Sequence, residues 1–145
     1  MFALKISDNV AVDDQYRTRN PNATDTATAG VWERGDPQST SSNGTKQLGT
    51  TTSGVNDLVT GRLSGSSSGE HDLDGGRSSI QSPAITLPAS GTLMLTFNYY
   101  LAHGSNSSSA DYLRVTIVGA SSSIVFKSSA TQTTTTRCGR RRPSI

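Results

Sequence analysis

The chain has 145 residues, a formal net charge of +2 and a hydrophobic share of only 32%. This length accommodates one domain, and so small an apolar share leaves that domain a thin core. No stretch approaches the roughly 20 consecutive apolar residues of a membrane helix, and the first ten residues lack the apolar segment of a signal peptide. We therefore expect a single domain with no membrane partner.

Small hydroxyl side chains dominate the composition, with 23 serines and 19 threonines. These residues suit turns and the solvent-facing side of a sheet, and inside helices their hydroxyl groups compete for backbone hydrogen bonds. No window keeps apolar residues at the spacing of an amphipathic helix for more than one turn. The sequence therefore predicts an all-β fold.

Basic charge is concentrated at the C-terminal end of the chain. Four of the 13 basic residues lie in the last nine positions, namely Arg137, Arg140, Arg141 and Arg142. No aromatic residue interleaves them, so a stacking platform for bases is not indicated. We interpret the run as a solvated tail and expect no nucleic-acid partner. The single cysteine, Cys138, lies in the same tail, which excludes an intrachain disulfide.

Short strands and polar turns alternate along the first half of the chain. Residues 1–20 begin with a short alternation of apolar and polar residues but form an atypical segment as a whole. Clearer strands are predicted over 30–34, 46–50 and 58–63. Residues 64–76 (SGSSSGEHDLDGG) are too polar and too rich in glycine to be buried, so we expect a long loop there. Long ordered loops tend to carry function or bind ions.

The strongest strand signals lie in the second half of the chain. The segment 92–101 (TLMLTFNYYL) alternates clearly and places Tyr99 on the core side and Tyr100 on the more exposed side. Further strands are predicted over 79–82, 84–87, 112–118 and 123–127. Short strands at a spacing of roughly 8–12 residues are typical of a β-sandwich or barrel. After Lys127 the alternation stops, and residues 128–145 are predicted to form a disordered tail rich in threonine and arginine.

Residues 21–127 resemble a known extracellular module. The strings that carry the resemblance are WERGDPQ, KQLGTT, NDLVTGRL, DLDGG, SIQSPAITLP and LTFNYYLAHGSNSSSADYLRV. They are similar to the β-jelly-roll accessory domains, MAM-like or P-like, that occur C-terminal to secreted bacterial metallopeptidases and subtilisin-like proteases. The fold implied by this resemblance is a β-sandwich of the jelly-roll kind.

The resemblance also implies a function. Domains of this kind are non-catalytic, assist a secreted hydrolase or engage its substrate, and often hold a structural calcium ion. We therefore expect a secreted, extracellular module that binds a polymeric carbohydrate or protein, with the parent protease domain absent here. Both ends of the chain depart from the family pattern, so the jelly roll is expected to be incomplete and completed by homo-oligomerisation.

The loop Glu70–Gly76 (EHDLDGG) contains the predicted metal site. Asp72 and Asp74 are two residues apart on an extended loop, and the glycines allow backbone carbonyls to turn inward. Calcium takes six to eight oxygen ligands of these kinds. Asp111 and Asp57, from turns elsewhere in the chain, are predicted to complete the site. The alternative is that Asp72 and Asp74 accept hydrogen bonds from loop amides.

A second hypothesis treats the chain as a small hydrolase of the glycosidase kind. Glu33 and Asp36 would then pair with Glu70 or Asp72 as the two catalytic carboxylates. The alternative for Glu33 is a surface Glu–Arg ion pair at a strand end. The sequence is compatible with both an accessory module and an enzyme, and the accessory module is the preferred interpretation.

Aromatic and polar side chains near predicted strand ends suggest a ligand site. Trp32 and Tyr100 are candidates to stack against a sugar ring, and His103 and Glu70 are candidates to bind its hydroxyl groups. For the aromatic residues the alternative is core packing. For His103 the alternative is a structural hydrogen bond.

Overall fold

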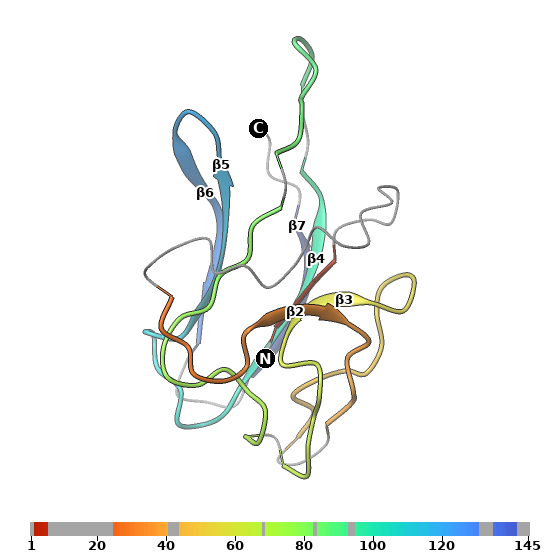
Figure 1. The fold of residues 1–145 in the computed structure, drawn as a ribbon, viewed down its shortest axis with the longest axis vertical. Helices are drawn as coiled ribbons and strands as arrows, with labels where there is room; N and C mark the ends of the chain where they lie inside the picture. Colours follow the sequence, from red (N-terminus) through yellow and green to blue (C-terminus); the bar gives the residue numbers. More distant parts are fainter. Residues whose placement is uncertain are drawn as a thin grey trace.

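The computed structural model describes residues 2–5, 25–40, 44–67, 69–82, 84–92, 95–130 and 135–141, and for 2–5 and 135–141 the backbone alone. Among these residues there are seven strands and no helix, so the predicted all-β fold is confirmed (Figure 1). The strands are β1 (Phe2–Lys5), β2 (Trp32–Gly35), β3 (Asp57–Thr60), β4 (Phe97–His103), β5 (Tyr112–Val118), β6 (Ser122–Ser129) and β7 (Thr135–Arg141).

The strands form two antiparallel sheets. One has five strands in the order β2-β3-β1-β4-β7, and the other is the β5–β6 hairpin. The register of the larger sheet places Trp32 opposite Thr60 and Leu101 opposite Arg137. The hairpin has an irregularity between Val115 and Thr116, which breaks the regular pairing of its two strands.

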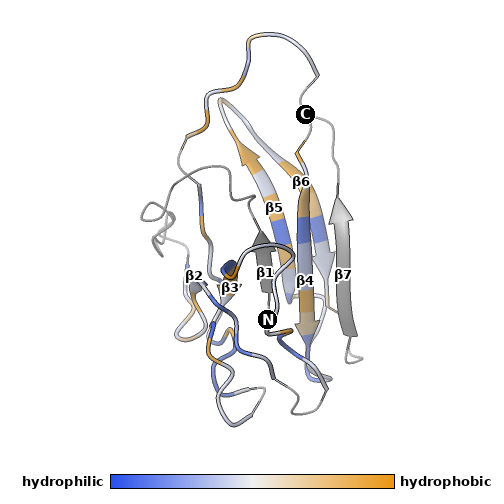
Figure 2. Ribbon diagram, turned by 90° about the vertical axis from the view of Figure 1, so that its right-hand side faces the viewer, coloured by the Kyte–Doolittle hydropathy of each residue, from blue (hydrophilic) through white to orange (hydrophobic). Residues whose placement is uncertain are grey.

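Buried aromatic side chains join the two sheets. The ring centroids of Phe97 and Phe126 are 5.7 Å apart at an interplanar angle of 74°, an edge-to-face contact. Figures 1 and 2 show the β5–β6 hairpin as a separate layer alongside β4. Burial follows from the alternation predicted for β5, because Leu113 is buried and Arg114 is exposed. The core cluster consists of Trp32, Leu58, Phe97, Tyr99, Leu101, Leu113 and Phe126.

Strand β4 is buried on both faces, and this corrects one expectation from the sequence. Tyr100 was expected to be the more exposed of the two adjacent tyrosines, but it is 6% exposed and Tyr99 is 8% exposed. The physical reason is a second covering segment. The Tyr100 hydroxyl donates a hydrogen bond of 3.0 Å to the carbonyl oxygen of Thr45, in the loop before β3.

The strand predicted over 112–118 is β5, with the same ends. The strands predicted over 30–34, 58–63 and 123–127 correspond to β2, β3 and β6 with shifted ends. The strand predicted over 92–101 is shorter, since β4 begins at Phe97; residues 93–94 lie outside the described part of the chain. No strand forms over 46–50, where Gln47 makes only a single bridge to Thr40. None forms in the described residues of 79–82 and 84–87 either. Ile85 and Leu87 are 69% and 54% exposed there. The alternation of apolar and polar residues in this segment is therefore not enough to form a strand.

Both ends of the chain contribute strands to the five-stranded sheet. β1, from the segment expected to be atypical, lies between β3 and β4. β7 lies within residues 128–145, where a disordered tail was expected, and it pairs with β4 from Phe97 to His103. The rest of the predicted 1–20 segment, residues 6–20, lies outside the described part of the chain. No helix in the described ranges is long and apolar enough to cross a membrane.

Candidate functional site

Two segments that are far apart in the sequence lie side by side before strand β2. The backbone amides of Thr26 and Ala27 both donate to the carbonyl oxygen of Arg77, at 3.0 and 3.1 Å. Ala29 and Asp74 form an isolated antiparallel bridge. The chain entering β2 is therefore held along the end of the long polar loop, about 50 residues later in the sequence.

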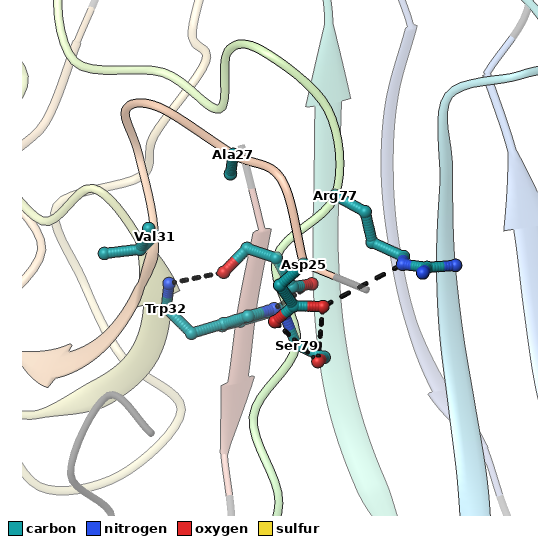
Figure 3. Close-up of a pocket in the computed structure, with 7 residues that line it drawn as sticks. Asp25, Ala27, Val31, Trp32, Arg77 and Ser79 are labelled. Carbon is teal, nitrogen blue, oxygen red and sulfur yellow. Dashed lines mark hydrogen bonds and ion pairs between the residues drawn. The ribbon is translucent and has the colours of Figure 1, made fainter. Parts of the chain in front are cut away.

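A small pocket of about 110 Å³ lies where these two segments meet Trp32 (Figure 3). The segment before β2 and the segment after the loop both contribute side chains to its wall. Figure 3 shows the indole ring of Trp32 extending toward Asp25 and Ser79. The lining residues are Asp25, Ala27, Val31, Trp32, Arg77, Ser78 and Ser79.

The tryptophan is fixed by two hydrogen bonds to one serine. The Trp32 indole Nε1–H donates to the carbonyl oxygen of Ser78, and the Trp32 backbone amide donates to the Ser78 hydroxyl oxygen, each at 3.2 Å. Trp32 as a whole is 9% exposed. Because a buried indole N–H needs a partner, this pair of bonds sets the orientation of the ring that borders the pocket.

The polar part of the pocket is centred on the carboxylate of Asp25. This side chain is 8% exposed, and it accepts hydrogen bonds from the backbone amide and the hydroxyl group of Ser79, both at 2.7 Å through Oδ2. The Nε atom of Arg77 lies 3.8 Å from Asp25 Oδ1. The pocket thus combines a buried acceptor, a cationic donor group and an aromatic edge.

The loop Glu70–Gly76 packs closely on the same region. Gly30 has φ +61°, and a Cβ atom there would overlap the backbone carbonyl of Asp72. Gly61 has φ +69°, and a Cβ atom there would overlap the carbonyl oxygen of His71. Glycine suits both positions for two reasons: φ is positive there, and another backbone segment lies too close for a Cβ atom. The loop is held against the ends of β2 and β3.

Asp72 and Asp74 are the predicted calcium ligands in this loop, and the charge of Asp74 acts on Asp72. Burial raises the pKa of the Asp72 carboxyl above its ordinary value, and the neighbouring charge of Asp74 raises it further. Both effects disfavour the ionised form of Asp72. A bound cation between the two carboxylates would reverse them.

The other two predicted ligands lie in different surroundings. Asp57 is a buried residue at the start of β3, opposite Gly35 of β2. Asp111 caps the loop after β4, since its Oδ2 accepts a hydrogen bond of 2.7 Å from the Ser108 amide. In the described part of the chain, no three Asp, Glu, His or Cys side chains are grouped as metal ligands. The described residues therefore do not bring the four predicted ligands together as one group.

The carboxylates of the glycosidase hypothesis are engaged locally. Glu33 accepts a 2.6 Å hydrogen bond from the Arg62 amide and lies 3.6 Å from Arg62 Nε, so the interpretation as a Glu–Arg ion pair at a strand end is confirmed. Hydrogen bonds from Ser66 hold the pKa of Glu70 below its ordinary value. Glu70 also lies 3.8 Å from Nε2 of His71. A general acid needs a raised pKa, and the surroundings of Glu70 act in the opposite direction.

His103 at the end of β4 has a structural hydrogen bond, as its alternative interpretation expected. Its Nδ1 lies 2.7 Å from the hydroxyl oxygen of Ser107, which also donates to the carbonyl oxygen of Gly104. The buried side chain of Lys46 donates from Nζ to the His103 carbonyl oxygen at 2.9 Å. These contacts close the loop after β4.

Sequence reasoning identified Trp32 but missed its partners in the pocket. Asp25 and Ser79 are 54 positions apart, and no short motif joins them. The one signal was compositional: Asp25 is an isolated charge in a threonine-rich segment, and Arg77 follows two glycines. Such signals do not specify a contact between the segments.

Comparison with protein-family models, curated proteins and solved structures finds no match for this chain.

Proposed function

We propose that this chain is a non-catalytic binding module that attaches to a polymeric substrate. The observation that carries the proposal is the pocket beside Trp32, where a buried carboxylate and an arginine lie next to an aromatic edge. Binding sites for organic ligands typically combine an apolar wall with a few polar groups that converge on it. Trp32 was one of the residues assigned to ligand binding from the sequence.

The wider setting of the module is part of the same proposal. The chain is a β-sandwich of the jelly-roll kind that accompanies a secreted hydrolase, such as a protease, outside the cell. Two observations support the sandwich: two antiparallel sheets, and aromatic contacts between them. The attached enzyme would carry the chemistry, and this module would hold it at its substrate.

We also propose a calcium ion at the loop Glu70–Gly76, held by two of the four carboxylates that the sequence predicted. Asp72 and Asp74 are the two carboxylates that support it, because the charge of Asp74 disfavours the ionised form of Asp72 in the absence of a cation. Backbone carbonyls and water would supply the other oxygen ligands that calcium prefers. The ion would stabilise the loop that borders the pocket.

Homo-oligomerisation is also proposed. Among the described residues, β5 and β6 pair only with each other, and a two-stranded sheet is marginally stable without further partners. The exposed side chains of Val118 and Ile124 lie on this hairpin. A strand from a second copy would extend the sheet. Sedimentation velocity supports this if the chain is dimeric and Ile124→Lys is monomeric, and a monomeric native chain contradicts it.

Co-sedimentation with insoluble polymers tests the binding function. The chain is mixed with washed cellulose, chitin, insoluble β-glucan, collagen or elastin, and the bound fraction is measured against a control protein of similar charge. Saturable binding to at least one polymer, without release of soluble fragments, is the expected result. Release of fragments that is abolished by Glu33→Gln or Glu70→Gln would establish the hydrolase instead.

A further inference from the structure

Among the described residues that line the pocket beside Trp32, two carry charges, and these charges cancel. Asp25 and Arg77 lie 3.8 Å apart and carry opposite charges. A cationic ligand would meet the guanidinium group of Arg77, and an anionic ligand would meet the carboxylate of Asp25. The pair therefore favours a neutral ligand that both donates and accepts hydrogen bonds.

The hydrogen-bonding capacity of the pocket suits hydroxyl groups. A carboxylate accepts about four hydrogen bonds, and the two donors of Ser79 occupy part of this capacity at Asp25. The Arg77 side chain is 43% exposed and brings N–H donors to the same place. Hydroxyl groups of a sugar can donate one hydrogen bond and accept another. This capacity matches the Asp25 carboxylate, an acceptor, beside the Arg77 guanidinium group, a donor.

The apolar part of the pocket suits the C–H face of a sugar ring. Ala27, Val31 and the edge of Trp32 form this wall, and Val31 is 47% exposed. The volume of about 110 Å³ is below the roughly 150 Å³ of a cavity that admits benzene. It therefore takes part of one ring and leaves the rest of a polymer outside.

We propose that this pocket binds one sugar ring of a neutral polysaccharide. Hydroxyl groups of the ring donate to Asp25 and accept from Arg77, and its C–H groups lie against Val31 and the edge of Trp32. A peptide strand is favoured less, because peptides that bind along a strand use a row of regularly spaced backbone groups. This inference rests on the proposed binding function and names the substrate class of that site.

Substitution of Ala27 by Phe tests the pocket. The larger side chain fills the space between the two segments, and the backbone hydrogen bond from Ala27 to Arg77 does not depend on the side chain. Ala84→Phe is the matched control, because Ala84 is exposed and is not among the pocket residues. Binding to cellulose, chitin, β-glucan, anionic pectate and collagen is measured for the native chain and both variants.

The expected result is binding to a neutral polysaccharide, weakened about tenfold by Ala27→Phe and unchanged by Ala84→Phe. Binding to collagen alone overturns the inference but keeps the binding function, and binding to no polymer overturns both. Binding to pectate alone also overturns the inference, since it requires an anionic ligand. If Ala27→Phe binds the neutral polysaccharide as tightly as the native chain does, the ligand lies elsewhere on the molecule. That result overturns the assignment of this pocket as the binding site.

A second measurement keeps the test valid if Ala27→Phe does not fold. The indole N–H of Trp32, the only tryptophan, gives one NMR signal and donates to Ser78 at the pocket wall. Addition of a soluble oligosaccharide of the bound polymer to the native chain is expected to shift this signal in a saturable way. A signal that stays unchanged at saturation overturns the inference.

Discussion

The ring of Tyr99 on β4 lies 4.7 Å from the ring of Phe126 on β6, measured between centroids, and this contact joins the two sheets. Phe126 also meets Phe97 edge to face. Three aromatic rings thus provide much of the apolar contact across a core that has few large side chains. No disulfide supports them, because the chain has a single cysteine.

Phe126→Ala is expected to destabilise the fold by about 3–5 kcal/mol, because it removes a buried aromatic side chain and leaves a cavity. Phe126→Leu retains part of the packing and should cost less. Chemical denaturation monitored by circular dichroism measures both changes. Val55→Ala, at a side chain that is 64% exposed, is the control and should stay within about 0.5 kcal/mol of the native chain. Equal effects of Phe126→Ala and Val55→Ala would refute the proposed core.

Gly30→Ala tests the close packing of the loop Glu70–Gly76 on the start of β2. Alanine at positive φ costs about 1–2 kcal/mol by itself, and at Gly30 its Cβ atom would also overlap the Asp72 carbonyl. Gly44→Ala is the matched control, since Gly44 has φ +87° and open space around its Cβ position. Thermal denaturation should show a larger loss for Gly30→Ala. The packing is wrong if the two variants lose the same stability.

Asp72→Asn separates the calcium proposal from a purely structural loop. In a chelator the native Asp72 is destabilising at neutral pH, because its folded pKa is raised and its charged form is disfavoured. The asparagine variant should therefore have a higher melting temperature than the native chain under those conditions. With calcium the order should reverse, since the variant loses one ligand. A native melting temperature that is the same in calcium and in chelator would rule out the ion.

The same carboxyl predicts a dependence on pH in chelator. A folded-state pKa above the unfolded value means that the folded chain binds the proton more tightly, so the destabilisation is complete above the raised pKa. It disappears as the pH falls through the raised pKa toward the ordinary value. The difference in melting temperature between Asp72→Asn and the native chain should therefore shrink from pH 7 to acid pH. A difference that grows on acidification contradicts the raised pKa.

Ser107→Ala is expected to loosen the loop after β4. It removes the hydroxyl group that lies 2.7 Å from His103 Nδ1 and donates to the Gly104 carbonyl oxygen. The loss of such a hydrogen bond costs about 1 kcal/mol. Ser121→Ala, at an exposed serine of the β5–β6 turn, is the control. Hydrogen exchange of the amides at 104–111 should accelerate in the first variant and stay unchanged in the second; unchanged exchange in both would show that Ser107 does not hold the loop.

Structural features that depend only on neighbouring residues along the chain could be predicted from the sequence. Strands β5 and β6 follow from alternation, and the burial of Trp32 follows from its size. The burial of Tyr100 could not be predicted this way, because it depends on Thr45 in a distant loop. Ile85 and Leu87 show the opposite case, where alternation is present but the side chains are exposed.

The site was less predictable than the fold for the same reason. Asp25 becomes a buried acceptor only because Ser79 and Arg77 lie beside it, and those contacts span more than 50 residues. Asp72 and Asp74 were predictable as a pair since they share one loop. Asp57 and Asp111 were added to that pair because they lie at turns next to predicted strands, and the fold places them in other surroundings.

The most direct test of the binding function uses the fluorescence of Trp32, which lines the pocket and is the only tryptophan of the chain. The native chain is titrated with soluble fragments of the polymer that it retains in co-sedimentation. A saturable change in emission, absent in Ala27→Phe and retained in Ala84→Phe, is the predicted result. Unchanged emission at full occupancy would contradict the assignment of this pocket as the binding site.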